Sequence, residues 1–255
     1  MLEQQPHLAV ITGGSRGLGR NAALALAHKG NDVIITYHSQ QAQAESLVLE
    51  VEALGRKAVA IQLDAGRTAS FDGFKDELLN VIQQNWQRED FDYLINNAGF
   101  GLYASIADTT EEQFDDLMNV HVKGVFFLTQ KLMPHLADHG AIINVSTGLT
   151  RFTIAGSAAY AAMKGAVEVL TKYMAKELGA RGIRVNTIAP GAIATDFGGG
   201  RLRNSEEMQG FIAGQTALGR TGEADDIGCV IAALCSPETG WVNAQRIEAS
   251  GGMFL

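Results

Sequence analysis

Tyr160 and Lys164 stand four positions apart in an alanine-rich, proline-free run from Ser157 to Val167. This composition predicts a helix, and side chains four positions apart on a helix project from the same face. A phenol has a reference pKa near 10, but an ammonium about 4 Å away, at an effective dielectric of about 20, favours its ionised form by roughly 4 kcal/mol, or about three pKa units. The pair therefore predicts a tyrosine that donates or accepts protons. Alone, this spacing is also typical of solvated helix faces.

Seven short runs rich in β-branched residues and leucine alternate with longer helical patterns. The runs predict strands at residues 8–12, 32–37, 58–63, 93–96, 141–146, 184–188 and 246–249, and the patterns predict helices that include 18–28, 41–54, 71–86 and 111–136. The alternation predicts an α/β fold: a Rossmann-type doubly wound, mainly parallel seven-stranded sheet with helices on both faces. Ligands of such sheets bind beyond the carboxyl ends of the strands, so we expect the chemistry in the turns that follow them.

Composition limits the domain organisation and the partners. The 255 residues include 46% hydrophobic residues, 29 glycines and only 4 prolines, and no charge block, low-complexity tract or repeat divides them. We therefore expect a single domain over residues 1–255. The net charge of −8 opposes binding to phosphate backbones and anionic membranes, so we expect neither nucleic acid nor a membrane as a partner.

The sequence indicates neither a targeting segment nor a metal site. Residues 1–7 lack the basic and apolar regions of a signal peptide, and no apolar run approaches the roughly 20 residues that cross a bilayer, so a cytoplasmic location is expected. Cys229 and Cys235 fall in one predicted helix, without Cys or His neighbours at metal-ligand spacing. We expect both to be small core residues, with no disulfide and no bound metal.

A glycine-rich turn joins the first predicted strand to the first predicted helix, with the sequence Thr12-Gly13-Gly14-Ser15-Arg16-Gly17-Leu18-Gly19. Its glycines permit a tight turn and a close approach of the backbone to a pyrophosphate, and the helix amino end offers free N–H groups and a favourable dipole. Such a turn can also be purely structural. Because a strand precedes it and a helix follows it, we expect it to bind a dinucleotide.

Four motifs, in this order, resemble those of the short-chain dehydrogenase/reductase family. They are the glycine-rich turn, Asn96-Asn97-Ala98-Gly99, Tyr160-x-x-x-Lys164 and Pro190-Gly191-x-x-x-Thr195, and together they cover almost the whole chain. Within the family the sequence is most similar to the 3-oxoacyl-(acyl-carrier-protein)-reductase-like branch. The resemblance implies hydride transfer between a nicotinamide and a carbonyl or secondary alcohol, with Tyr160 as the acid or base and with Lys164 lowering its pKa and anchoring the ribose. It also implies a homotetramer, a dimer of dimers, with helices 111–136 and 160–178 in a dimer interface.

The resemblance further assigns the contacts of the dinucleotide. Asp64 and Ala65 would lie beside the adenine and Asn97 near its ribose, while Ile193 and Thr195 would hold the nicotinamide carboxamide. Alternatively, Asp64 caps a helix that begins near residue 68, and Thr195 only caps the segment that follows it. The remaining contacts implied by the motifs come from Thr12, Gly13, Ser15, Gly17, Leu18, Gly19, Ala98, Gly99, Tyr160, Lys164, Pro190 and Gly191.

The adenosine end predicts a preference for NADP(H) over NAD(H). The second predicted strand ends Thr36-Tyr37-His38-Ser39, without the acid that would bind a ribose 2′-hydroxyl and repel a 2′-phosphate. Arg16 matches a family position from which a basic side chain reaches the 2′-phosphate, and His38 or Ser39 could add a hydrogen bond. Alternatively, Arg16 only covers the start of the helix.

Two positions depart from the family pattern. The catalytic serine of the family stands thirteen residues before the tyrosine, where this chain has Thr147, with Ser146 one place earlier. Successive residues of an extended segment point in opposite directions, so only one of these hydroxyls should face the substrate. The position favours Thr147, and the residue type favours Ser146.

The family's catalytic asparagine aligns with His121 rather than with Asn119. An imidazole both donates and accepts hydrogen bonds, so His121 could help to hold a water in the proton path to Lys164. Alternatively, His121 is a buried structural residue, and a backbone carbonyl holds the water.

Residues 196–214 resemble the family's mobile substrate lid, and Gly198-Gly199-Gly200 suits a hinge. Within the lid, Arg201 and Arg203 either attract an anionic substrate or are solvated surface charges. Arg151 and Phe152 are expected to line or border the substrate pocket, whose ligand the sequence does not identify. We predict an NADP(H)-dependent oxidoreductase acting on a small carbonyl or alcohol substrate. The alternatives are a catalytically weak dinucleotide-binding regulatory protein of the same fold, and an epimerase or dehydratase, whose relatives are generally longer.

Overall fold

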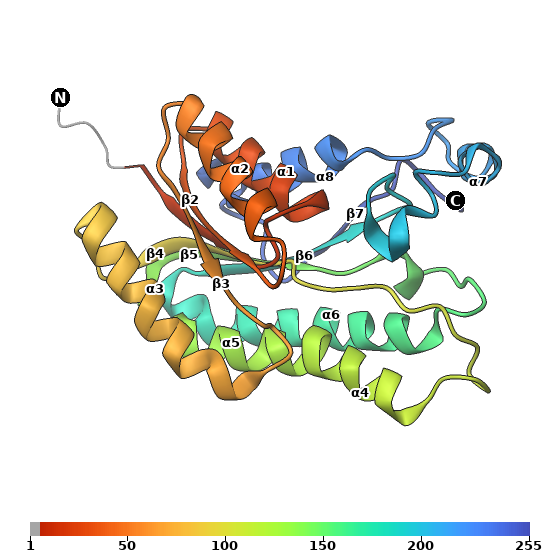
Figure 1. Ribbon diagram of the computed structural model, residues 1–255, viewed down its shortest axis with the longest axis horizontal. Coiled ribbons are helices and arrows are strands. Elements are labelled where there is room, and N and C mark those ends of the chain that lie inside the picture. Colours follow the sequence, from red (N-terminus) through yellow and green to blue (C-terminus); the bar gives the residue numbers. More distant parts are fainter. Residues whose placement is uncertain (1–5) are drawn as a thin grey trace.

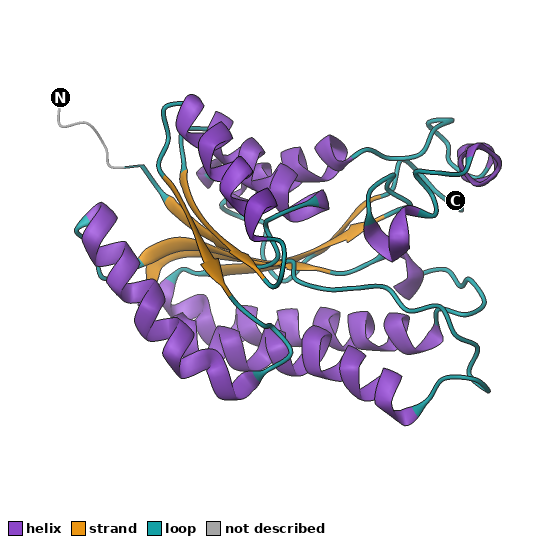
Figure 2. Cartoon of the chain, in the orientation of Figure 1, coloured by secondary structure: helices purple, strands orange, loops and turns teal. Residues whose placement is uncertain are grey.

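The computed structural model describes residues 6–255, which form one sheet between two layers of helices (Figure 1, Figure 2). The strands are β1 (Leu8–Ile11), β2 (Asp32–Tyr37), β3 (Ala58–Gln62), β4 (Phe91–Asn96), β5 (Leu136–Val145), β6 (Arg184–Pro190) and β7 (Arg246–Ala249). All neighbouring pairs of this seven-stranded sheet are parallel, in the order β3-β2-β1-β4-β5-β6-β7. The predicted doubly wound α/β fold is confirmed.

The strand order reverses between β1 and β4. From β1 the chain winds outward to β2 and β3, returns to β4 on the other side of β1, and then winds outward to β7. At such a switch point the loops after the two central strands diverge, which leaves room for a ligand beyond their carboxyl ends. The loop after β1 is the glycine-rich turn and the loop after β4 begins with Asn97, so two motifs far apart in the sequence meet there.

The helices cover both faces of the sheet (Figure 1). One face is covered by α1 (Gly17–His28), α2 (Gln41–Ala53) and α8 (Ala224–Cys235). The opposite face is covered by α3 (Phe71–Trp86), α5 (Val125–Leu132) and α6 (Ala158–Leu178), with α4 (Glu111–Met118) leading into α5. The short helix α7 (Glu206–Gly214) lies apart from both layers, near the C-terminus.

Alternation along each strand divides its side chains between two apolar cores. In β1, Ala9 and Ile11 pack with α1 and α8, whereas Leu8 and Val10 pack with α3 and α5. Since helices cover both faces, strands such as β1 carry apolar residues on both faces rather than on one face only. Burial of a side chain such as Ile11, which has no exposed surface, is worth on the order of 1.5–3 kcal/mol.

The predicted helix over 111–136 is interrupted. After α4 the chain forms a π-helical segment, Asn119–Gly124, then α5, then a 3-10 turn, Met133–His135, and β5 already begins at Leu136. Pro134 in that turn has no N–H to donate, which ends the helix. The π-helical segment Asn119–Gly124 contains no proline that would mark an interruption, so the sequence pattern did not reveal it. Such segments are frequent at functional sites, and this one carries His121.

The two cysteines differ in their surroundings. Cys235 is buried as expected, but Cys229 is exposed on the same helix, so the prediction of two core cysteines is wrong for Cys229. No cluster of His, Cys, Asp or Glu that could hold a metal occurs in residues 6–255. Over the same residues, no helix combines the length and the apolar character needed to span a bilayer. Residues 1–5, which belong to the segment expected to lack a targeting signal, lie outside the described residues.

Candidate active site

The glycine-rich turn is tied to the loop after β4 through Thr12 and Asn97. The Thr12 hydroxyl accepts hydrogen bonds from the backbone N–H groups of Asn97 and Ala98, both at 3.0 Å. The Asn97 amide donates to the carbonyl oxygens of Thr12 and Gly13, at 2.9 and 3.0 Å. A Cβ on Gly19 would lie 2.4 Å from both the Asn97 amide nitrogen and the Gly13 oxygen, so only glycine fits at that position. The Asn97 amide thus holds the turn, and its expected place near the adenine ribose stays a prediction.

The amino end of α1 is open toward ligand. Arg16 occupies the cap position with extended backbone, and its side chain does not cap the helix. The backbone N–H groups of the first turn, at Gly17, Leu18 and Gly19, have no partner within the helix and offer donors to an anion. Beside this helix a hollow of about 240 Å³ is lined by Gly17, Arg20, Asn21, Leu24, Thr195, Asp196, Arg203 and Ala224. The turn and the start of the lid therefore border the same space.

The residues expected at the adenosine end follow β1, β2 and β3. Arg16, His38 and Ser39 are exposed. Asp64 accepts a hydrogen bond from the Gly66 N–H at 2.9 Å, which closes a local turn, and its other oxygen lies 3.9 Å from His38 Nε2. The alternative of Asp64 as the cap of a helix near residue 68 is therefore not what the structure contains. Asp64 and His38 are neighbours at one end of the carboxyl edge.

The residues expected at the carboxamide follow β6. Pro190 ends that strand in the interior, and the Gly191 N–H donates to the Ala249 oxygen at 3.0 Å. Ile193 forms an isolated parallel bridge with Gly222. The Thr195 hydroxyl accepts a 3.3 Å hydrogen bond from the Phe197 N–H, which closes a local turn, while the cap position of the 3-10 helix that follows is Asp196.

Tyr160 and Lys164 lie on one face of α6, in the interior. Their exposed fractions are 8% and 4%. The Lys164 Nζ donates a 2.7 Å hydrogen bond to the Val145 carbonyl at the end of β5, and it lies 5.8 Å from the centre of the Tyr160 ring. The helix therefore presents both side chains beside the carboxyl end of β5, at the edge where parallel sheets bind their ligands.

The pKa values of the pair differ from the simple electrostatic expectation. Burial raises the pKa of the Tyr160 phenol above its ordinary value, and a contact with the Thr147 hydroxyl only partly opposes this. Burial also lowers the pKa of Lys164 to about 8. Loss of hydration disfavours the charged form of each group and is the largest cause of both changes in pKa. The predicted lowering of the tyrosine pKa by Lys164 is thus wrong for the structure described here.

Thr147 and Ser146 point to different surroundings. The Ser146 hydroxyl is buried and donates to Glu168 Oε1 at 2.7 Å. The Thr147 hydroxyl accepts from the Leu149 N–H at 3.3 Å and contacts the Tyr160 phenol. Since β5 ends at Val145, the alternation of an extended chain separates the two hydroxyls. Of the two hydroxyls, that of Thr147 contacts Tyr160, whereas that of Ser146 binds Glu168.

His121 lies against Tyr160 from the π-helical segment. It has no exposed surface, and its ring meets the Tyr160 ring edge-on with centres 5.3 Å apart. Its Nε2 lies 2.9 Å from the Phe100 carbonyl oxygen, which fixes Nε2 as the protonated nitrogen. Burial, aided by the charge of Lys164, lowers the pKa of His121 to about 3, so the ring is neutral. Its Nδ1 is buried without a hydrogen-bond partner in residues 6–255 and keeps a free lone pair.

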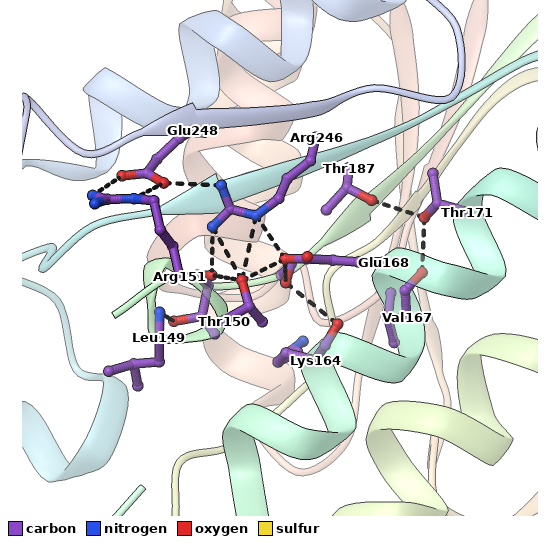
Figure 3. A network of polar contacts seen from close by, with 12 residues as sticks. Leu149, Thr150, Arg151, Lys164, Val167, Glu168, Thr171, Thr187, Arg246 and Glu248 are labelled. Carbon is purple, nitrogen blue, oxygen red and sulfur yellow. Dashed lines mark hydrogen bonds and ion pairs between the residues drawn. The ribbon is translucent and has the colours of Figure 1, made fainter. Parts of the chain in front are cut away.

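A polar network around Arg246 and Glu168 joins β7, α6 and the loop after β5 (Figure 3). Arg246 of β7 donates to Glu168 of α6 and to Glu248, both at 2.9 Å, and to the Thr147 carbonyl at 3.2 Å. Glu168 also accepts from Thr150 at 2.7 Å. We call Arg246, Glu168, Glu248 and the groups bound to them the Arg246 network. It holds the backbone that carries Thr147.

Arg151 extends this network to the end of the chain. It pairs with Glu248 through two hydrogen bonds of 2.6 and 2.8 Å, which lowers the pKa of Glu248 to about 2, and it donates to the carbonyls of Met253 and Phe254. Phe152 packs against Phe254, with ring centres 4.9 Å apart. The two residues expected to border the pocket thus anchor the C-terminus to the loop after β5.

The lid arginines also have partners in the chain. Arg203 forms an ion pair with Asp196, and the Arg201 guanidinium lies 5.1 Å from the centre of the Tyr103 ring. Both arginines are nevertheless exposed, so the choice between attraction of an anionic substrate and a surface charge stays open.

Sequence reasoning missed the Arg246 network, although two signals were available. Glu168 follows Lys164 by four positions, so it lies on the same helical face as Tyr160, where a carboxylate is costly unless paired. Arg246 and Glu248 are two positions apart on a strand, so they share one face. A carboxylate on the buried face of α6 and an arginine on β7 together indicate a buried ion pair.

Comparisons with known proteins agree with this arrangement. Residues 13–254 match the family model described as Enoyl-(Acyl carrier protein) reductase. An uncharacterized oxidoreductase of Methylorubrum extorquens is 37% identical, over 99% of this chain and 100% of that protein. The 3-oxoacyl-(acyl-carrier-protein) reductase FabG of Staphylococcus epidermidis is 35% identical, over 97% of this chain and 98% of that protein.

Solved structures are similar over nearly the whole chain. The promiscuous reductase LugOII, which catalyses keto-reduction at C1 during lugdunomycin biosynthesis, superposes with a TM-score of 0.93 at 35% identity, covering 98% of each chain. The angucycline C-6 ketoreductase LanV with bound NADP has a TM-score of 0.92 at 31% identity, covering 97% of this chain and 95% of that one. The motifs, the fold and these relatives show that the chain belongs to the short-chain dehydrogenase/reductase family, in its 3-oxoacyl-(acyl-carrier-protein)-reductase-like branch.

Proposed function

We propose that this protein is an NADP(H)-dependent carbonyl reductase, or an alcohol dehydrogenase in the reverse direction, with Tyr160 as its acid or base. The observation that carries the proposal is the convergence of Tyr160, Lys164 and the Thr147 hydroxyl at the carboxyl end of β5. A ketone oxygen that reaches this point would meet two hydroxyl groups at once. That is the requirement for protonating and stabilising a developing alkoxide.

The residues at the switch point fit a nicotinamide dinucleotide. The open amino end of α1 would hold the pyrophosphate, and Thr195, which lines the same hollow, would lie toward the carboxamide. When bound, the nicotinamide supplies or accepts the hydride. Lys164 would anchor the ribose, because it reaches the same edge from α6. The NADP complex of LanV supports this choice of cofactor class.

A preference for NADP(H) follows from the charges at the adenosine end. No acid stands at the end of β2, and Arg16 is exposed beside the open helix end. A guanidinium there would pair with a 2′-phosphate. His38 and Ser39 are exposed at the same end and would add hydrogen bonds, while Asp64 and Ala65 would border the adenine.

In the proposed mechanism each side chain has one task. The Tyr160 phenol donates its proton to the carbonyl oxygen, and the Thr147 hydroxyl donates a hydrogen bond to the same oxygen. Lys164, whose pKa of about 8 is close to neutral, replenishes the proton. The free Nδ1 of neutral His121 accepts a hydrogen bond from a water on that path. Ser146 acts only through Glu168.

The substrate would be a small molecule that carries a ketone or a secondary alcohol. LanV has been solved with NADP and rabelomycin, and LugOII is described as promiscuous, which supports a small-molecule ketone. The alternative of a catalytically weak regulator is not favoured, since the proton-transfer groups are assembled. We propose a single domain whose lid spans about residues 196–214. A cytoplasmic location stays a prediction from the sequence.

We also propose a homotetramer, a dimer of dimers. Large apolar side chains remain 40–65% exposed on α4, α5 and α6, the helices expected in a dimer interface; they are Phe114, Phe126, Phe127, Val169 and Tyr173. An association that covers them removes apolar surface from water. Light scattering should give about four times the chain mass of 27.2 kDa. A monomer would contradict this assembly.

The test of the function is turnover of NADPH with a panel of ketones, compared between the wild type and Tyr160→Phe. The variant keeps the ring and removes the proton donor, so we expect a loss of about a hundredfold or more in kcat with little change in NADPH affinity. Fluorescence titration of NADPH measures the affinity separately. Near wild-type turnover in the variant would rule out Tyr160 as the acid. Absence of turnover by the wild type with intact cofactor binding would favour the regulatory alternative.

A further inference from the structure

Three large rings remain partly exposed around Tyr160. Phe100 and Tyr103, in the loop after β4, are 38% and 55% exposed, and Phe197, on the lid, is 47% exposed. The Phe197 ring centre lies 5.8 Å from that of Tyr160, and the Phe100 ring centre lies 5.4 Å from that of His121. The buried His121 ring meets Tyr160 edge-on and so connects Tyr160 to Phe100. The exposed parts of Phe100, Tyr103 and Phe197 therefore lie near the proposed proton donor, and we call them the aromatic surface.

The chain is built to seat Phe197 at this place. A Cβ on Gly101 would come within 2.8 Å of the Phe197 ring, so the ring packs against Gly101 and a larger residue there would displace it. The next residue, Gly198, has a φ of +60°, and this backbone conformation turns the lid away directly after the phenylalanine. The lid therefore contacts the loop after β4 through the Phe197 ring, which packs against the backbone of Gly101.

Tyr103 and Arg201 make the second contact between the lid and this loop. The guanidinium lies 5.1 Å from the centre of the Tyr103 ring, a distance at which a cation is attracted to the ring face. The aromatic surface thus has two parts. One is Tyr103 with the Arg201 guanidinium over its ring, and the other is Phe197 packed against Tyr160. Both parts offer aromatic rings to a substrate.

We infer that the preferred substrates carry a planar aromatic ring next to the reacting carbonyl. The inference rests on the proposed function, because it concerns the approach to Tyr160. Only 8% of Tyr160 is exposed and the Phe197 ring lies against it, so a ketone that reaches its hydroxyl must pass beside Phe197. Aromatic pairs gain a ring–ring attraction beyond the burial of their area, which a saturated chain of equal size does not gain.

The experiment compares acetophenone with cyclohexyl methyl ketone, which differ only in the unsaturation of the ring. The two ketones differ in intrinsic reactivity, so the measured quantity is the ratio of their kcat/KM values in the wild type and in Phe197→Leu. We expect Phe197→Leu to lower kcat/KM for acetophenone by about threefold to tenfold and to change that for cyclohexyl methyl ketone by less than about twofold. Phe100→Leu should act in the same direction.

Two controls separate aromatic contact from disturbance of the lid. Phe197→Tyr keeps the ring and should retain the wild-type ratio. Trp241→Leu removes a fully exposed ring. Trp241 precedes the amino end of β7, whereas the site lies at the carboxyl ends of the strands, so the ratio should stay unchanged. Equal losses for both ketones in Phe197→Leu, with the ratio unchanged, would overturn the inference. So would a wild type that reduces a short 3-oxoacyl thioester efficiently and both ring ketones poorly.

Failure of the proposed function gives a different result. In that case the wild type would bind NADPH but reduce neither the ring ketones nor the thioester, and the Tyr160→Phe comparison would show no difference. Turnover with an unchanged ratio contradicts only the inference about the aromatic substrate.

Discussion

The Arg246 guanidinium lies 3.2 Å from the Thr147 carbonyl oxygen, so β7 holds the backbone of the residue whose hydroxyl contacts Tyr160. The same guanidinium bonds Glu168 and Glu248, which are 17% and 19% exposed. A charge with so little contact with water needs its partners in place. The position of Thr147 therefore depends on two acids that bind Arg246 rather than Thr147 itself.

Glu168→Ala should reduce kcat by about tenfold, because it frees the Thr150 and Ser146 hydroxyls and loosens the backbone at Thr147. KM for NADPH should change little. The free energy of unfolding, measured by urea denaturation, should fall by about 1–3 kcal/mol, the cost of leaving buried partners unpaired. Asp72→Ala, which removes an exposed ion pair with Lys131, is the control and should change neither quantity appreciably. A destabilised variant with unchanged kcat would mean that Glu168 is only structural.

Thr147→Ala should cost far more activity than Ser146→Ala, by about 2–4 kcal/mol of activation free energy if Thr147 acts as an oxyanion donor. Thr147→Ser keeps the hydroxyl and should restore most of the rate. The measurement is kcat/KM with one ketone for all three variants. The opposite ranking would show that Ser146 leaves Glu168 and faces the substrate.

His121→Asn should retain kcat within about tenfold, because an amide also accepts a hydrogen bond from a water. His121→Leu fills the site without an acceptor and should lose more. Since the pKa of His121 is lowered to about 3, the wild-type pH–rate profile should contain no step near pH 6.5 from this ring. A large loss in a folded His121→Asn variant would instead point to a role that only an imidazole fills.

Lys164 should make stability depend on pH. Its folded pKa is lowered to about 8 from 10.5, so between these values the unfolded chain binds more protons than the native protein. Stability therefore rises with pH in this window, by about 1 kcal/mol per pH unit from this group. In Lys164→Met this rise should be absent. Lys172→Met, an exposed residue on the same helix, is the control and should keep the wild-type slope. Urea denaturation at several pH values from 7 to 10 measures the free energy of unfolding and its slope with pH. Identical slopes for Lys164→Met and the wild type would contradict the lowered pKa of Lys164.

Arg16→Ala should abolish most of the preference for NADPH. We expect the wild type to favour NADPH over NADH by about tenfold or more in kcat/KM, which corresponds to about 1.4 kcal/mol from one charge-assisted contact. The variant should lose this ratio while its activity with NADH stays nearly constant. Equal use of both cofactors by the wild type, or an undiminished preference in Arg16→Ala, would refute the role of this side chain.

Local patterns alone were sufficient for much of the molecule. The alternation of apolar runs predicted the α/β class and all seven strands, because strand and helix periodicities are short-range properties. The four positions between Tyr160 and Lys164 placed both side chains on one face of α6, since helical geometry is independent of the rest of the chain. The glycine-rich turn was located for the same reason.

Only the tertiary structure showed the properties that depend on burial or on residues distant in the sequence. The pKa of Tyr160 is raised rather than lowered because the fold removes the pair from water, which spacing does not reveal. The choice between Ser146 and Thr147 depends on Glu168, 22 and 21 residues further along the chain, and on Arg246, which comes from the last strand. Phe197 meets Tyr160 only because the lid folds back over the loop after β4. Sequence determined the class of chemistry through local geometry, whereas the surroundings of each reacting group arise from contacts that only the folded chain brings together.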